Sequence, residues 1–249
     1  MIKLCRGERP EELTDEMVQQ LTDEYKTNGS SVWRKIYITK KLLEYSHGKC
    51  AYCECDITEE SKYLEVEHFH HKDEYSDEVV KWENLLPSCK KCNSTKGTHD
   101  TYKEPIVDPT EQDPKHYFKF KLYRIKGIDE LGRMTESVLN LNDYDRHVIS
   151  RFKIGNAIQV QLENYLNMME EYESGTSIST LRKNKIINGL KGLMKIALPD
   201  REYSATAATV LLTCDDFKTL KEKMANSGLW DCEHNELFDK CNICKFEIN

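Results

Sequence analysis

The sequence lacks any long apolar run, and it has no excess of positive charge. No stretch approaches the roughly 20 apolar residues that cross a bilayer, and Met1 to Arg6 contain no apolar segment like that of a secretory signal. Internal repeats and low-complexity tracts are also missing. Hydrophobic residues make up 39% and charged residues 32% of the chain, a composition typical of globular proteins. We therefore expect a soluble, cytoplasmic protein that does not interact with membranes.

The acidic balance, a net charge of −7, argues against tight nucleic-acid binding by the chain alone, because phosphates are neutralised by lysine and arginine. The charge is unevenly distributed, however. Residues 84–126 carry nine basic and five acidic side chains, whereas the segments on either side are net negative. This pattern favours a local nucleic-acid contact and a partner that helps to hold the substrate.

Two amphipathic helices are predicted near the N-terminus. Thr14 is a suitable N-cap for a helix that ends at Asn28-Gly29, and a second helix is expected from about Ser31 to Ser46. Their apolar spacing is that of helices that pack against a core. Residues 1–48 are therefore interpreted as an N-terminal helical segment.

The C-terminal half is also predicted to be helical. Asn142 or Asp143 can cap a long helix that reaches about Glu173, and another helix is expected from about Ser179 to Ala197. We interpret residues 121–249 as a helical module that forms a lid or docks a partner.

Between these helical parts, residues 49–120 lose the helical period. Tyr63 to Glu67 is expected to form a short strand, and a helix that starts after Cys89 should end near Gly97. Residues 98–120, which are rich in Pro, Asp, Thr and Lys, are interpreted as an irregular linker. The fold class predicted from these elements is α+β.

The ten cysteines include C-x-x-C pairs, which in a reducing compartment indicate metal binding. Cys50 and Cys53 form one pair, and Cys89 and Cys92 form another. Four thiolates in two such pairs fit a closed, structural Zn²⁺ site. The alternative is that all four are reduced cysteines in a hydrophobic core.

A second zinc site is a further hypothesis. Cys232, His234, Cys241 and Cys244 offer four soft ligands within 13 residues, and Cys214 is an additional candidate. The Cys-x-His spacing is unusual for a zinc knuckle, so these residues can also be ordinary thiols and an ordinary histidine.

Between the two cysteine pairs, Glu67 and His68 place a carboxylate next to an imidazole at the end of the predicted strand. A nuclease that uses one hard cation needs oxygen ligands to hold the ion and a neutral imidazole to deprotonate water. Glu67 can supply an oxygen ligand and His68 the base. Asn84 is expected to orient His68 by a hydrogen bond, and Asn93 to supply an amide oxygen.

In this order, the cysteine pairs, Glu67-His68, Asn84-Leu85-Leu86 and the Cys-Asn-x-x-Lys-Gly run from Cys92 to Gly97 resemble the HNH endonucleases. The resemblance implies a ββα-metal domain, with a structural four-cysteine zinc site, embedded in a mainly α-helical body. It also implies that Glu67 and Asn93 bind the catalytic metal and that His68 activates water. Asn93 stands in the place of the family's last histidine, which favours Mg²⁺ or Mn²⁺.

Three other side chains are candidates for substrate contact: His70, His71 and Lys96. The histidines can also be extra ligands, and Lys96 can equally be a solvated helix residue.

The resemblance extends to a subfamily. Four segments are similar to the PtuB-type HNH nucleases of Septu and retron-associated anti-phage systems: residues 1–7, 50–54, 66–69 and 82–86. This similarity implies a PtuA-like ATPase partner of the ABC/SMC type. A retron reverse transcriptase with its non-coding DNA or RNA is a further partner that it implies.

We therefore predict a metal-dependent endonuclease that hydrolyses phosphodiester bonds of DNA, with a structured RNA such as tRNA as the alternative substrate. The main rival is a non-catalytic zinc-binding adaptor that docks a partner or nucleic acid. A zinc hydrolase of small molecules fits less well, because four thiolates leave no position for water.

Overall fold

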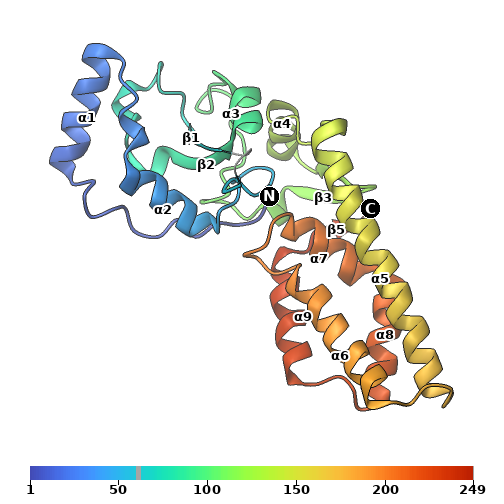
Figure 1. Ribbon diagram of the computed structural model, residues 1–249. Coiled ribbons are helices and arrows are strands. Elements are labelled where there is room, and N and C mark those ends of the chain that lie inside the picture. Colours follow the sequence, from blue (N-terminus) through green and yellow to red (C-terminus); the bar gives the residue numbers. More distant parts are fainter. Residues whose placement is uncertain (60–62, 249) are drawn as a thin grey trace. The chain divides into compact units, whose positions relative to one another are not determined.

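The computed structural model describes residues 1–59 and 63–248, which form two compact units. Unit 1 contains residues 1–117 and 126–141, and unit 2 contains residues 118–125 and 142–249 (Figure 1). The predicted α+β class is confirmed, with helices predominating in the described residues. No helix in the described part of the chain is long and apolar enough to cross a membrane.

Unit 1 begins with two helices, α1 (Asp15–Asn28) and α2 (Ile36–Ser46). The predicted limits of α1 are confirmed: the hydroxyl of Thr14 accepts a hydrogen bond from the amide of Met17, and Gly29, at φ 70°, terminates the helix. The second helix begins later than expected. Residues Val32–Arg34 form a 3-10 turn and Lys35 is extended, so the chain bends before α2 starts.

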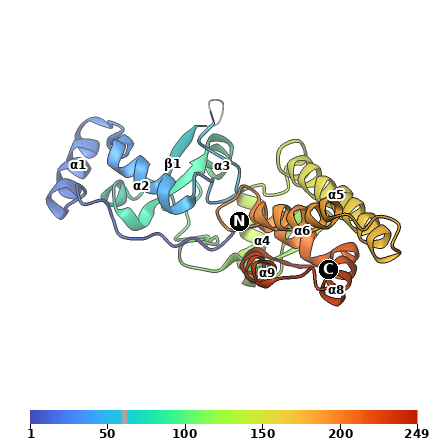
Figure 2. The same cartoon turned by 60° about the horizontal axis from the view of Figure 1, so that its bottom comes forward.

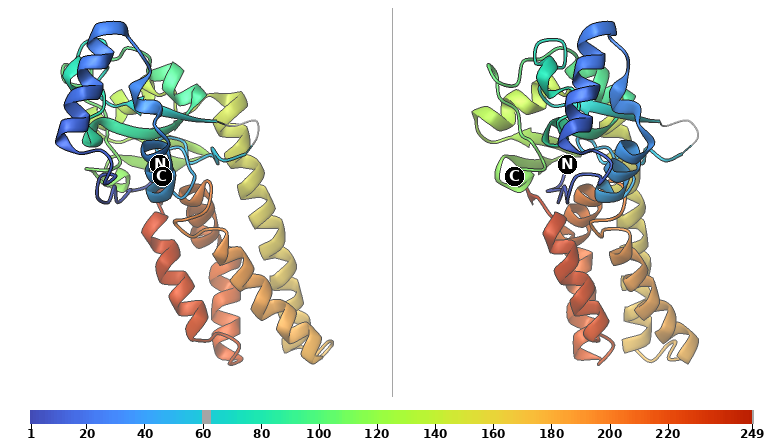
Figure 3. Two further views of the ribbon diagram at one scale, coloured as in Figure 1. Left: turned by 60° about the vertical axis from the view of Figure 1, so that its left-hand side comes forward. Right: turned by 90° about the vertical axis from the view of Figure 1, so that its left-hand side faces the viewer.

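Helix α2 packs beside an antiparallel hairpin of strands β1 (Leu64–His68) and β2 (Leu85–Cys89), as Figure 3 shows, and α1 contacts the 3-10 turns Val32–Arg34 and Ser76–Glu78. Two 3-10 turns, Ser76–Glu78 and Trp82–Asn84, lie in the connection between the strands. Helix α3 (Lys90–Lys96) follows β2 directly and ends at Gly97. The core of this region is formed by apolar side chains from several of these parts, including Leu21, Ile38, Leu42, Val66, Val80 and Leu85.

The last part of unit 1 is helix α4 (Glu130–Val138), which the sequence analysis did not predict. A 3-10 turn at Pro114–His116 lies earlier in this unit. Asp129 caps α4 by accepting a hydrogen bond from the amide of Gly132 at 2.7 Å. A Cβ atom on Gly132 would lie 2.2 Å from the carbonyl oxygen of Tyr117, so only glycine allows this close approach of two backbone segments.

Unit 2 is mainly helical (Figure 2). Its helices are α5 (Ile149–Glu173), α6 (Thr180–Lys195), α7 (Ser204–Thr213), α8 (Asp215–Asn226) and α9 (Cys232–Cys244). A small sheet has the strand order β4-β3-β5, formed by β3 (Phe118–Lys121), β4 (Arg124–Gly127) and β5 (Glu247–Ile248). The last two residues of β4 are assigned to unit 1. Strands β3 and β5 are parallel, with Lys119 opposite Glu247.

Both helices predicted individually in this half are confirmed. A π-helical turn, Tyr144–Val148, precedes α5, and the side chain of Asp143 caps it by accepting from the amide of Arg146. Ser179 caps α6 in the same way, by accepting from the amide of Arg182. Helix α5 contacts α6, α7 and α8, so it is the central support of unit 2.

Candidate active site

The four predicted zinc ligands come together in unit 1. Cys50, Cys53, Cys89 and Cys92 are buried, and their sulfur atoms all lie within 4.8 Å of one another. The sulfur atoms of Cys53 and Cys89 are 3.8 Å apart. A tetrahedral ion with Zn–S bonds of about 2.3 Å requires sulfur atoms about 3.8 Å apart. The cluster is therefore a closed metal site of a size that suits zinc.

Two turns present these thiols. The first follows α2, where Glu54 adopts a left-handed conformation (φ 65°) and the Cys50 amide donates to the carbonyl of Cys55 at 2.9 Å. The second is the start of α3, where the sulfur of Cys89 accepts a hydrogen bond from the amide of Cys92 at 3.4 Å. The cluster thus joins the end of β2 and the start of α3 to the turn that follows α2.

Glu67 lies on β1, opposite Leu86 of β2, and is 2% exposed. Its carboxylate pairs with the ammonium of Lys96 from α3 at 2.7 Å, and the same ammonium donates to the carbonyl of His68 at 2.9 Å. Burial raises the pKa of Glu67 to about 7, although the positive charge of Lys96 opposes this shift. The buried ammonium of Lys96 therefore compensates the negative charge of the Glu67 carboxylate.

His68 is the last residue of β1 and is also buried. Its Nε2 lies 2.8 Å from the carbonyl oxygen of Val79. A carbonyl can only accept, so Nε2 carries the proton, and in the neutral ring Nδ1 keeps its lone pair. Burial lowers the pKa of His68 to about 4, and the charges of Lys72 and Lys96 act in the same direction. The ring is therefore neutral near pH 7 and can accept a proton.

Asn84 lies in the 3-10 turn before β2 and is 1% exposed. The expected hydrogen bond to the His68 ring is not what the structure has. The amide nitrogen of Asn84 donates to the carbonyls of His70 and Glu78, and its oxygen accepts from the amide of His70 at 2.6 Å. Asn84 therefore connects the two ends of the loop formed by residues 69–79. The carbonyl of Val79, in the same loop, holds the imidazole ring of His68.

Asn93 lies in the second turn of α3, three residues before Lys96. Residues at this spacing share one face of a helix. Asn93 is partly exposed.

The sequence of this region and of the whole chain matches known proteins. Residues 50–99 match the HNH endonuclease family. The chain is 47% identical to the Septu protein PtuB of Bacillus thuringiensis over 95% of its own length and 92% of that protein. The chain belongs to the HNH endonuclease family. It is also 23% identical, over 74% of its length and 76% of that protein, to the Septu protein PtuB of Bacillus mycoides (strain KBAB4).

Glu67 and Asn93, the expected ligands of the catalytic metal, are of a chemical type that fits a hard divalent cation. Glu67 and Asn93 offer a carboxylate and an amide oxygen, which are ligands of the type that such ions prefer. The site is chemically distinct from the four-thiolate cluster.

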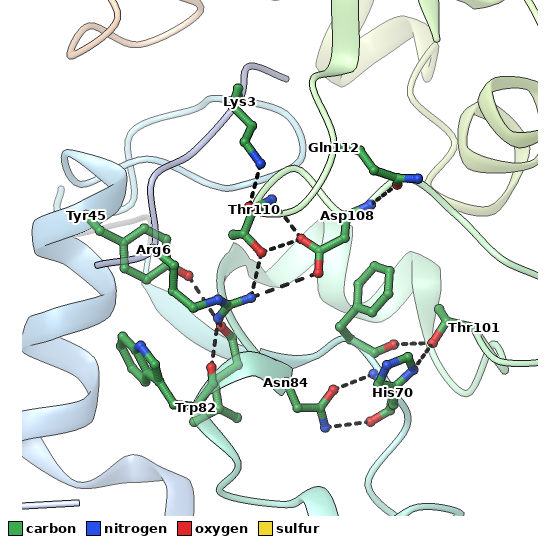
Figure 4. A network of polar contacts seen from close by, with 12 residues as sticks. Lys3, Arg6, Tyr45, His70, Trp82, Asn84, Thr101, Asp108, Thr110 and Gln112 are labelled. Atoms are coloured by element: carbon green, nitrogen blue, oxygen red, sulfur yellow. Dashed lines mark hydrogen bonds and ion pairs between the residues drawn. The ribbon is translucent and has the colours of Figure 1, made fainter. Parts of the chain in front are cut away.

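The HNH hairpin is also held by a residue that the sequence analysis missed, Arg6. Its guanidinium donates to the carbonyls of Trp82 and Leu85, at 2.8 and 2.5 Å, on either side of Asn84 (Figure 4). It also donates to the hydroxyl of Thr110 at 2.7 Å. Arg6 lies 76 or more positions before Trp82 and Leu85 along the chain, and no local sequence pattern connects it with them. Only the tertiary structure could therefore show that Arg6 supports the hairpin.

The three candidate substrate contacts differ in their surroundings. His70 donates from Nδ1 to the Thr101 hydroxyl, which itself donates to the carbonyl of Phe69, and the His70 ring stacks on Tyr102 at 3.7 Å. His71 is partly exposed, and its Nε2 lies 3.6 Å from the carboxylate atom Oδ2 of Asp73. Lys96 is only 3% exposed, and its ammonium is engaged with β1.

The hypothesis of a second zinc site in this endonuclease is wrong for the described residues. Among them, the only group of three or more His, Cys, Asp or Glu side chains whose ligand atoms lie close enough to hold one ion is that of Cys50, Cys53, Cys89 and Cys92. Cys232, His234, Cys241 and Cys244 all lie on α9, and the twelve-residue step between the two outer cysteines spans about 18 Å along a helix. His234 pairs with Asp231 in a capping box, and the thiol of Cys241 donates to the carbonyl of Met194. Cys214 lies between α7 and α8, outside any such cluster.

Proposed function

We propose that this HNH endonuclease hydrolyses phosphodiester bonds of nucleic acid with His68 as the general base. DNA is the proposed substrate, and a structured RNA such as tRNA is the alternative. The observation that carries the proposal is the bond from His68 Nε2 to the Val79 carbonyl, which leaves the lone pair of Nδ1 to accept a proton. Water is the nucleophile, so the chemistry requires no 2′-hydroxyl.

In this mechanism, His68 takes a proton from a water molecule that attacks the phosphorus in line with the leaving 3′ oxygen. Glu67 and Asn93 would hold Mg²⁺ or Mn²⁺. Such an ion, when bound, neutralises negative charge that grows on the phosphate and the leaving oxygen. Lys96 keeps the carboxylate of Glu67 in place through its 2.7 Å ion pair. Zn²⁺ in the four-cysteine cluster would have a structural role only, since it has no open coordination position.

We further propose that the chain is the nuclease of an anti-phage complex with a PtuA-like ATPase of the ABC/SMC type. Two observations support this: the PtuB relatives are Septu proteins, and the net charge of −7 makes a partner useful for holding nucleic acid. The names of these relatives refer to Septu alone, so a retron reverse transcriptase and its nucleic acid are not part of the proposal.

The experiment is cleavage of plasmid DNA and of total cellular RNA by the chain together with its ATPase, in Mg²⁺ and in Mn²⁺. His68→Ala should lower the rate by about 10²–10⁴-fold, the usual contribution of a general base. His116→Ala, which removes an exposed imidazole outside the site, is the matched control and should cut at the wild-type rate. Equal cutting by wild type and His68→Ala would overturn the assignment of the base. Cutting of RNA alone would replace DNA by the alternative substrate.

A further inference from the structure

The aromatic ring of Trp33 lies against the ring of the proposed base. The centroids of Trp33 and His68 are 4.8 Å apart, and the ring planes are perpendicular. Trp33 lies in the 3-10 turn Val32–Arg34, outside residues 50–99 that match the HNH family. The N-terminal segment therefore contributes a side chain to the site.

His68 needs a second contact to be held in one orientation. The hydrogen bond from its Nε2 to the Val79 carbonyl fixes one nitrogen. The outermost torsion of a histidine side chain has a broad energy minimum, so a bond at one ring edge leaves the ring free to rock. An aromatic ring placed edge-to-face at 4.8 Å restricts this motion and favours one geometry.

Trp33 is itself fixed by its neighbours. The ring of Tyr25 packs edge-on against it at 5.8 Å, and the ammonium of Lys72 lies over it at 5.6 Å. The hydroxyl of Tyr25 donates to Asp73 at 2.6 Å. Helix α1 and the 69–79 loop therefore both support the indole. Trp33 is partly exposed, and the rest of its side chain packs against the hydrophobic core of unit 1.

We propose that Trp33 is a positioning residue that, together with the Val79 carbonyl, holds the His68 ring with Nε2 protonated and Nδ1 directed for proton abstraction. The inference rests on the proposed role of His68 as the base. Trp33 acts through His68 and does not bind substrate. Its removal should therefore lower kcat, whereas the removal of a substrate-binding residue should raise KM.

The kinetic test compares Trp33→Ala, Trp33→Leu and Trp33→Phe in the complex with the ATPase. Small misplacements of a catalytic group cost up to about 10²-fold in rate, so the Ala and Leu variants should lose about 10- to 100-fold in kcat with KM unchanged. Trp33→Phe keeps an aromatic ring and should retain most of kcat. Ile36→Ala, a change at a side chain that is 82% exposed, is the control and should match wild type. A raised KM with normal kcat, or equal activity of the Leu and Phe variants, would overturn the proposal.

A second readout does not depend on activity. In ¹⁵N-histidine-labelled protein, the His68 signals, assigned by their loss in His68→Ala, should show a single tautomer with Nε2 protonated. In Trp33→Ala the two nitrogen shifts should move toward the average of both tautomers, while one zinc per chain is retained. Unchanged His68 shifts in Trp33→Ala would overturn the inference, even if the proposed nuclease function failed its own test.

Discussion

Glu67 is a carboxylate that is buried before it meets a metal ion. Its pKa is raised to about 7 by burial, so below that pH the folded chain keeps a proton on this side chain. A metal ligand must be deprotonated, and binding then releases the proton. In the proposed role of Glu67 as a metal ligand, protons and the catalytic cation therefore compete for its carboxylate below pH 7.

From this competition we predict that the Mg²⁺ concentration needed for half-maximal cleavage falls by roughly tenfold per pH unit up to about pH 7 and is level above it. His68 does not contribute to this change, because its pKa of about 4 keeps it neutral throughout. Mg²⁺ titrations of cleavage between pH 5.5 and 8.5 test the prediction. A half-maximal Mg²⁺ concentration that is constant over this range would contradict it.

Asn84 connects two parts of the active-site loop by three hydrogen bonds to the backbone of His70 and Glu78. We expect Asn84→Ala to lower the free energy of unfolding by about 1–3 kcal/mol, because buried backbone groups lose their partners. Asn84→Asp has the same shape but directs a charged acceptor at two carbonyls, so it should be the more harmful change.

Chemical denaturation of the Asn84 variants is the measurement, and Asn184→Ala, an exposed position on α6, is the control and should have little effect. Both Asn84 variants should also reduce kcat, because Val79, which holds His68, directly follows Glu78. Wild-type stability of Asn84→Asp would show that these hydrogen bonds contribute little.

At the scale of elements, two helical glycines have opposite expected responses to a larger side chain. In α4, a Cβ on Gly132 would lie 2.2 Å from the backbone of Tyr117, and backbone cannot move aside as a side chain can. In α6, a Cβ on Gly192 would meet no atom within 4 Å. Gly132→Ala should therefore destabilise by about 1–3 kcal/mol, whereas Gly192→Ala should stabilise by up to about 1 kcal/mol. Thermal unfolding of the two variants decides this, and equal shifts in Tm would refute the argument.

Elements with a local physical signature were predictable from the sequence. Helix α1 has Thr14 and Gly29 at its ends, and α6 has Ser179. Other elements have no such signature. Helix α7 is buried along most of its length and lacks an amphipathic face, and β5 has only two residues. The start of α2 was misplaced because Lys35 is extended, which its neighbours in sequence do not indicate.

In the candidate site, too, residues with a local sequence pattern were predictable and residues without one were not. The spacing of its cysteines was enough to predict the cluster around Cys50, because two short turns fix two ligands each. The same reasoning failed for Cys241 and Cys244, since a C-x-x-C within a helix does not bring in further ligands by itself. Arg6 and Trp33 were not predicted at all, because their partners lie 35 or more residues away along the chain.

At the scale of the whole molecule, the two units have different sources of stability. Unit 1 contains the four-cysteine cluster, whereas unit 2 is built on the packing around α5. Removal of zinc by a strong chelator should therefore abolish the calorimetric unfolding transition of unit 1 and preserve that of unit 2. Cys89→Ser should have the same effect without chelator. Cys232→Ser, at an exposed thiol, should keep one zinc per chain and both transitions. A single transition that zinc removal shifts as a whole would contradict this prediction.

The course of the chain has a consequence for how such proteins recombine. Residues 118–125 belong to unit 2 but precede residues 126–141, which belong to unit 1. A single genetic crossover at any point from 118 to 141 therefore joins pieces of both units from different parents. The similarity to the Bacillus thuringiensis protein extends over 95% of the chain, which includes both units. An exchange of either unit intact between two such proteins therefore needs three crossovers, one after each of residues 117, 125 and 141.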